Sequence, residues 1–105
     1  MIPNLIGNKP NWKAIRDGLK EMGREDIFII EDSADTVTYT EESDVSTTSF
    51  YASHVITAGG MGGMVMFNDE KHVKRALMYR DWGRIGDNSE DMSDRFAHDV
   101  DGIPY

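Results

Sequence analysis

The feature that most constrains this chain is a short apolar run, Ile27-Phe28-Ile29-Ile30, with acidic residues on both sides. Four consecutive apolar residues are typical of a strand that is buried on both faces, as strands of parallel sheets are. A sheet of this kind needs other elements packed against it. The run therefore predicts an α/β protein, with a strand over residues 27–30 near its centre.

A helix is predicted directly before this strand. Apolar residues recur there every three or four positions, which gives the helix one apolar face, and Asn11 is suited to cap its first turn. Gly23 is suited to end it. Helix, short loop and buried strand form one αβ unit of a layered fold. The apolar positions are Trp12, Ile15, Leu19 and Met22.

Further elements follow along the chain. Residues 44–51 are rich in β-branched and aromatic side chains and predict a second strand, and residues 64–67 predict a third after a glycine-dense turn. A second helix is expected from Glu70 to about Trp82, with Asn68 or Asp69 as its cap. Residues 36–43 are polar and fit a loop or a short strand, and residues 84–95 show no clear pattern. Two helices cannot cover both faces of such a sheet, which indicates a piece of a larger domain.

Composition excludes several classes of function. The 105 residues carry a net charge of -8, which disfavours binding to nucleic acids or to anionic membranes. No apolar run is long enough to span a bilayer, and the N-terminus lacks the pattern of a signal peptide. The chain has no cysteine, so disulfides and cysteine-ligated clusters are excluded, and its three histidines lack the spacing of a metal site. We expect a cytoplasmic protein without a metal centre.

Polar residues that could carry chemistry follow the predicted strands. Glu31 and Asp32 follow the first strand, where ligands of open α/β sheets bind, although on position alone a solvated strand end or a helix cap is the commoner role of such residues. Ser49 and His54 end the second strand, where a hydroxyl could bind phosphate and an imidazole could transfer a proton. A polar loop explains these two as well. The turn Gly59-Gly60-Met61-Gly62-Gly63 matches no nucleotide-binding motif.

Several segments, taken in order, resemble the DegT/DnrJ/EryC1/StrS family over nearly the whole chain. Its members are pyridoxal-phosphate-dependent enzymes of fold type I that act on nucleotide-linked keto sugars, and most are aminotransferases. The resemblance implies a partial large domain, an αβα sandwich with a mostly parallel or mixed sheet, here a single domain over residues 1–105. The matching segments are I-I-E-D-S-A-D-T (29–36), S-T-T-S-F-Y-A-S-H (46–54), G-G-M-G-G-M-V (59–65), N-D-E (68–70), R-D-W-G-R (80–84) and D-G-I-P-Y (101–105).

The resemblance also implies roles for single residues. Asp32 matches the aspartate that pairs with the pyridine nitrogen of the cofactor, and keeps that nitrogen protonated. Ser49 matches the serine that binds the cofactor phosphate. Asp35 stands near the ring, where the family often has glutamine or histidine. His54 falls at the position of the lysine that binds the cofactor covalently.

An imidazole cannot form that covalent bond. A minority branch of the family has histidine here, and its members are sugar 3-dehydrases that hold pyridoxamine phosphate non-covalently and use the histidine as a base. Some carry an iron–sulfur cluster, which a chain without cysteine cannot ligate. The resemblance thus implies dehydrase chemistry in a longer parent protein involved in lipopolysaccharide biosynthesis, and a homodimer or higher oligomer. A sugar aminotransferase relative, an inactive relative and a non-catalytic, self-associating module remain alternatives.

Overall fold

The computed structural model describes residues 1–81, 83 and 99–104. Contacts divide the chain into two compact units, Met1–Asn68 and Asp69–Tyr105. The single domain expected over residues 1–105 stays a prediction. Among the described residues, no helix has both the length and the apolar character needed to cross a membrane.

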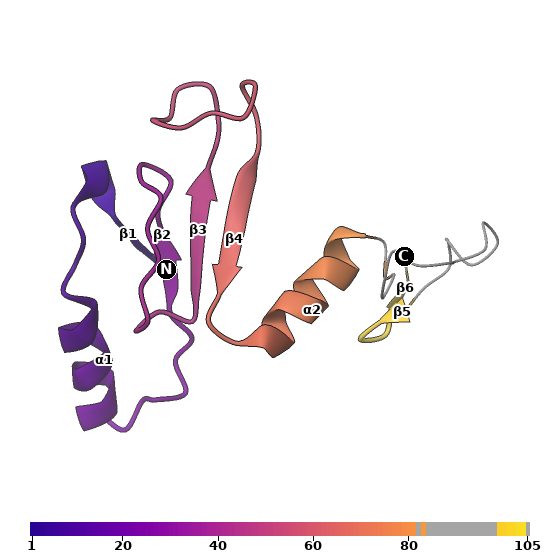
Figure 1. The fold of residues 1–105 in the computed structure, drawn as a ribbon. Coiled ribbons are helices and arrows are strands. Elements are labelled where there is room, and N and C mark those ends of the chain that lie inside the picture. Colours follow the sequence, from indigo (N-terminus) through magenta and orange to yellow (C-terminus); the bar gives the residue numbers. More distant parts are fainter. Residues whose placement is uncertain (82, 84–98, 105) are drawn as a thin grey trace. The chain divides into compact units, whose positions relative to one another are not determined.

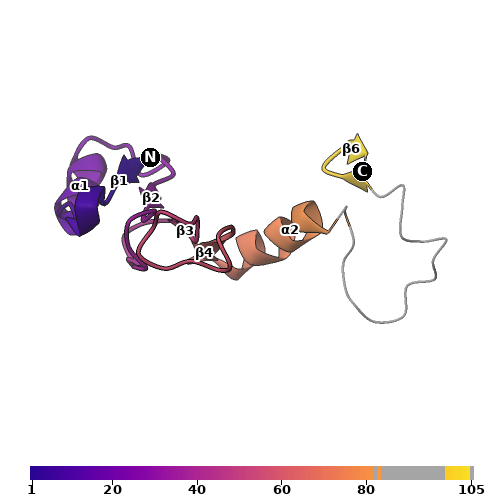
Figure 2. The same cartoon turned by 90° about the horizontal axis from the view of Figure 1, so that it is seen from above.

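A four-stranded sheet forms the centre of the first unit. Its strands lie side by side in the order of the chain, as both views show (Figure 1, Figure 2). The first three pair in parallel, and the fourth runs antiparallel to the third. The sheet is therefore mixed, which confirms the α/β class expected from the sequence. The strands are β1 (Ile2–Pro3), β2 (Ile30–Asp32), β3 (Val45–Ser49) and β4 (Gly63–Phe67).

The strand predicted over residues 27–30 lies further along the chain, so its predicted position was wrong. Of the four apolar residues only Ile30 belongs to β2, and Phe28 is 47% exposed. The reason lies in Asp44, whose carboxylate accepts a hydrogen bond from the Ile29 backbone N–H at 2.6 Å. The Asp44 side chain thus occupies the Ile29 N–H, which would otherwise be free to pair with a neighbouring strand. Regular strand pairing begins one residue later, at Ile30 opposite Val45.

The first helix agrees with its prediction. Helix α1 spans Trp12–Glu21, and Asn11 caps it by accepting a hydrogen bond from the Ala14 N–H. Gly23 has a φ of +67°, and the N–H groups of Gly23 and Arg24 donate to the carbonyls of the last turn, which is a Schellman ending. In both views α1 lies on the β1 side of the sheet (Figure 1, Figure 2).

The other elements of the first unit also lie close to their predicted positions. Strand β3 falls within residues 44–51, and β4 begins one residue before its prediction. The glycine-dense segment connects them beyond the end of β3 (Figure 1). Residues 36–43 form a loop that returns from β2 to β3. A short 3-10 turn, η1 (Leu5–Gly7), follows β1 and holds Ile6 at a φ of +55°, a conformation that is strained for a β-branched residue.

Polar side chains make up much of the buried interior of this unit. Few apolar side chains are buried there, among them Trp12, Ile29 and Val45. Sheet faces normally bury apolar side chains against a second layer. In β4 the side chains of Met64 and Val65 are instead 40% and 53% exposed. The buried polar residues of the unit are Asn4, Glu31, Ser33, Thr40, Ser43, Ser46 and Thr48.

The second unit begins with the second predicted helix. Helix α2 spans Glu70–Arg80, two residues shorter than expected, and the cap is Asp69, which accepts a hydrogen bond from the Lys71 N–H. Two-residue strands, β5 (Asp99–Val100) and β6 (Ile103–Pro104), pair antiparallel across a tight turn. This hairpin was not predicted, although its turn residues Asp101 and Gly102, with φ angles of +56° and +79°, form a dipeptide that is typical of two-residue hairpin turns. The unpatterned segment 84–95 lies outside the described residues.

Candidate functional site

A small hollow opens at the carboxyl ends of β2 and β3. These strands are parallel, so the segments that follow them meet at one edge of the sheet, where open α/β proteins bind ligands. The hollow encloses about 40 Å³. Ligand pockets commonly enclose about 300–1,000 Å³, so the described residues supply one wall of such a site. The hollow is lined by Ala34, Asp35, Thr36, Val37, Thr48, Ser49, Val55 and Ile56.

Asp35 and His54 come together beside this hollow. The Nδ1 atom of His54 lies 3.5 Å from Oδ1 of Asp35, which is an ion-pair contact when the imidazole is protonated. The other Asp35 oxygen accepts a hydrogen bond from the Ile6 backbone N–H at 3.3 Å. Asp35 is thus held from one side by the turn after β1 and faces His54 on the other.

A turn at the end of β3 positions His54. The His54 N–H donates to the Tyr51 carbonyl at 2.9 Å, and the two rings meet edge to face with centroids 6.3 Å apart. The imidazole is 23% exposed, so it keeps access to solvent and to a ligand. His54 does not itself line the hollow, but the next two residues do.

Three residues with hydroxyl groups line the hollow, and one of them, Thr48, already donates its hydroxyl proton to the Thr36 carbonyl at 2.8 Å. The Ser49 Oγ accepts a hydrogen bond from the Tyr51 N–H at 3.2 Å, which leaves the hydroxyl proton available for an anionic ligand. Thr36 Oγ1 is buried and has no hydrogen-bond partner in the part of the chain that the structure describes. An unpartnered buried hydroxyl is costly and is a natural place for a ligand contact. No role was predicted for Thr36, although it is the last residue of the family-like segment 29–36.

Asp32 ends β2 but does not line the hollow. Its side chain is half-buried, and Oδ1 accepts a hydrogen bond from the Ala34 N–H at 3.1 Å. Among the described residues Oδ2 accepts none, so this oxygen can pair with a cationic group. The structure therefore brings Asp35, Ser49 and His54 to one place and leaves Asp32 next to it, on the same strand end.

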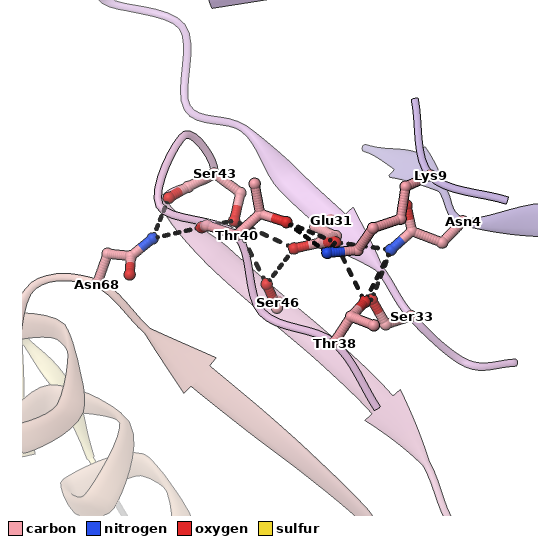
Figure 3. Close-up of polar contacts among 9 residues, drawn as sticks. All are labelled: Asn4, Lys9, Glu31, Ser33, Thr38, Thr40, Ser43, Ser46 and Asn68. Atoms are coloured by element: carbon pink, nitrogen blue, oxygen red, sulfur yellow. Dashed lines mark hydrogen bonds and ion pairs between the residues drawn. The ribbon is translucent and has the colours of Figure 1, made fainter. Parts of the chain in front are cut away.

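Glu31 takes none of the three roles that the sequence suggested for it, a ligand contact, a solvated strand end or a helix cap. Its side chain is 0% exposed and lies at the centre of a polar cluster (Figure 3). Ser46 Oγ and Asn4 Nδ2 each donate to it at 2.6 Å, and Thr40 Oγ1 donates at 3.0 Å. Burial tends to raise the pKa of this carboxyl, but the hydrogen bonds from Ser46, Asn4 and Thr40, with the Lys9 charge, together lower it. Glu31 is thus a buried, ionised group.

These residues fit a phosphorylated pyridine cofactor in part. A free carboxylate oxygen at Asp32, the Ser49 hydroxyl and the unpartnered Thr36 hydroxyl match a cationic ring nitrogen and a phosphate in chemistry. No lysine is among the residues that line the hollow, so the described wall offers no amine for covalent attachment.

Two known proteins are similar to this chain in sequence. "Lipopolysaccharide biosynthesis protein RfbH" of Salmonella typhimurium (strain LT2) is 33% identical over 91 residues, covering 80% of this chain and 20% of that protein. "dTDP-4-dehydro-2,6-dideoxy-D-glucose 3-dehydratase" of Saccharopolyspora spinosa is 34% identical over 92 residues, covering 80% of this chain and 19% of that protein. The chain spans about a fifth of the length of these relatives.

A solved structure has a similar fold over most of the length of this chain. The aminotransferase from Psychrobacter cryohalolentis matches with a TM-score of 0.67 and 28% identity, covering 79% of this chain and 22% of that one. The family model of the DegT/DnrJ/EryC1/StrS aminotransferases matches residues 1–105. Since the match runs over the whole length and agrees with the fold, the chain belongs to the DegT/DnrJ/EryC1/StrS aminotransferase family.

Proposed function

We propose that this chain is part of the large domain of an enzyme that acts on nucleotide-linked 4-keto sugars with pyridoxal or pyridoxamine phosphate, and that its reaction is a 3-dehydration. The observation that carries the proposal is a histidine at position 54, next to a carboxylate and beside a hollow without lysine. A relative whose name includes "3-dehydratase" supports it.

Two residues of this chain would hold the cofactor. The Asp32 carboxylate would accept a charge-assisted hydrogen bond from the ring nitrogen, and the Ser49 hydroxyl would donate to the phosphate. When bound, the cofactor supplies an electron-withdrawing ring. Asp32 keeps that ring protonated, because a carboxylate close to the nitrogen favours its cationic form.

His54 would act as the base. The Asp35 carboxylate faces Nδ1 and favours a proton on that atom, which leaves the lone pair of Nε2 directed away from Asp35. Nε2 would then take a proton from carbon, and the electron pair of that C–H bond would expel the 3-hydroxyl group, which takes up a proton from solvent and leaves as water. The partly exposed ring can reach a bound substrate and can return its proton to solvent.

The rest of the proposal concerns the setting of the enzyme. We expect it to work in the cytoplasm as a homodimer or higher oligomer, on a nucleotide-linked sugar used for lipopolysaccharide, since a relative is named for that biosynthesis. The net charge of -8 argues against nucleic acid as a partner.

The test uses a full-length protein that carries this segment, with cofactor binding followed by absorbance and dehydration measured separately. His54→Asn should leave cofactor affinity within about threefold and reduce dehydration by about 10²–10⁴, as expected for loss of a general base. Asp32→Asn should weaken cofactor binding about tenfold or more, because a charged partner becomes a neutral one. His72→Asn, on α2, is the matched control and should change neither.

Dehydration that survives in His54→Asn would contradict the assigned base. Amino transfer in place of dehydration would favour the aminotransferase alternative, for which the solved aminotransferase of similar fold is the present support.

A further inference from the structure

Glu31 lies between two segments that both hold Asp35. Its carboxylate is fully buried within β2, and donors approach it from the N-terminal segment and from the loop that joins β2 to β3 (Figure 3). Side chains alternate along a strand, so Glu31 and Asp32 point to opposite faces of the sheet. Glu31 therefore points away from Asp32, and it is not among the residues that line the hollow.

The first segment is the turn after β1. The Asn4 Nδ2 group donates to Glu31 at 2.6 Å, and the Asn4 backbone N–H donates to the Asp32 carbonyl at 2.8 Å. Two residues later the Ile6 N–H donates to the Asp35 carboxylate. Because Ile6 has a strained positive φ, an anchor on one side is needed to keep the turn in this conformation. The Glu31–Asn4 hydrogen bond supplies that anchor.

The second segment is the loop 33–44, which carries Asp35. The hydroxyl of Thr40 donates to Glu31 at 3.0 Å, and that of Thr38 lies 3.4 Å away. Asn4 Nδ2 also donates to Ser33 at 2.8 Å, so the beginning of the loop is tied to the same cluster. The loop is held from outside as well, where the Asn68 side chain donates to the carbonyls of Thr40 and Ser43.

We infer that Glu31 is a positioning residue: it fixes the turn that contacts Asp35 and the loop that carries Asp35, and thereby holds the Asp35 carboxylate against Nδ1 of His54. The inference deepens the proposed function, since it concerns the orientation of the proposed base. Asp35 itself touches His54; Glu31 acts through it.

The negative charge of Glu31 is essential to this role. An ionised carboxylate only accepts hydrogen bonds and has about four lone-pair positions for the donors around it. A glutamine of the same shape would place an NH₂ donor among these donors and leave at least one contact repulsive. The lowered pKa of the Glu31 carboxyl, in which the hydrogen bonds outweigh burial, agrees with a site built for the ionised form.

The test reads the His54 ring directly in the unmodified 105-residue chain and in Glu31→Gln. The ¹⁵N chemical shifts of the imidazole at neutral pH report which nitrogen carries the proton, and they need no cofactor. In the unmodified chain the neutral ring should be predominantly protonated on Nδ1. In Glu31→Gln this preference should fall to the mixture of a free imidazole, and the contact between the Ile6 N–H and Asp35 should be lost.

Two further variants separate positioning from general loss of stability. Val45→Ala removes buried apolar contacts in β3 and leaves the polar cluster intact, so the tautomer preference should remain. Thr40→Val keeps the shape of the side chain and removes one of the donors to Glu31, so this variant should fold even where Glu31→Gln does not. It should reduce the preference of the His54 ring for a proton on Nδ1, but not abolish it. The inference would be overturned if folded Glu31→Gln or folded Thr40→Val kept the full preference for a proton on Nδ1 of His54. It would also be overturned if Val45→Ala lost that preference to the same extent as Glu31→Gln. Absence of cofactor binding, in contrast, would count against the proposed function alone.

Discussion

At the scale of single residues, the buried carboxylate of Glu31 links the stability of the fold to pH. Its pKa is lowered in the folded chain, so the folded state holds this proton less tightly than the unfolded state does. The stabilisation is complete above the unfolded pKa, about 4.3, and is lost as the pH falls through the lower folded value. Acid should therefore weaken the fold in this window.

Glu31→Gln removes this contribution. We expect the free energy of unfolding at pH 7 to fall by about 2–4 kcal/mol, because the donors around the buried group lose their charged acceptor. The difference from the unmodified chain should narrow below about pH 4. Urea unfolding at a series of pH values measures this, with Glu41→Gln, an exposed position of the same loop, as a control that stays close to the parent. A difference that is constant with pH would contradict the assignment.

Single residues also show which parts of the candidate site could be predicted from the sequence and which could not. Asp32, Asp35, Ser49 and His54 were expected at the site from their places in a family pattern, although Asp35 and His54 are not the usual residues at those places. The structure puts Asp35 in contact with His54, and it puts Asp35 and Ser49 in the wall of one hollow. Glu31 was expected at a solvated strand end, a helix cap or a ligand, because acidic residues after an apolar run usually face water. The donors that make its burial possible come from positions 4, 40 and 46, and no local pattern reveals that these positions meet.

At the scale of elements, the positions of helices and strands were predicted correctly where the sequence pattern lies within the element itself. Apolar periodicity and caps predict α1, β3, β4 and α2 to within about two residues, since each signal lies inside its own element. The position of β2 depends on Asp44, which lies 15 residues away from the Ile29 that it contacts. Strands of two residues, such as β1, carry no alternation, so they are recognised only from their pairing.

Replacing glycine by alanine at two positions, Gly63 in β4 and Gly18 in α1, tests how closely these elements are packed. A Cβ at Gly63 in β4 would lie 2.9 Å from the Thr48 carbonyl oxygen of β3, so Gly63→Ala should destabilise by about 1–3 kcal/mol. A Cβ at Gly18 in α1 meets no atom within 4 Å, so Gly18→Ala should stabilise by up to about 1 kcal/mol through helix propensity. Thermal unfolding followed by circular dichroism measures both. Equal effects of the two changes would mean that β3 and β4 are less closely paired than the structure shows.

At the scale of the whole molecule, the small number of buried apolar side chains among the described residues has a consequence for assembly. Several large apolar side chains are strongly exposed, including Ile6 at 82%, Val55 at 86% and Met61 at 75%. Exposed apolar surface and an open sheet edge favour association. We predict a dimer or larger oligomer for the purified chain, measured by light scattering at micromolar concentration. A stable monomer would contradict this expectation, and Val55→Ser should shift the distribution toward smaller species.

The central claim is that His54 stands at the position of the family's cofactor lysine, so that the cofactor is held without a covalent bond to this residue. Replacing His54 with lysine in a full-length protein that carries this segment tests it most directly. After borohydride reduction with pyridoxal phosphate, peptide mapping should find a specific adduct on residue 54 of His54→Lys and no adduct there in the parent. The same variant should lose dehydration, because an amine bound to the cofactor cannot act as the free base. His72→Lys, with its lysine on α2, should show no specific adduct at residue 72. A folded His54→Lys protein that binds the cofactor yet leaves residue 54 unmodified would contradict the claim.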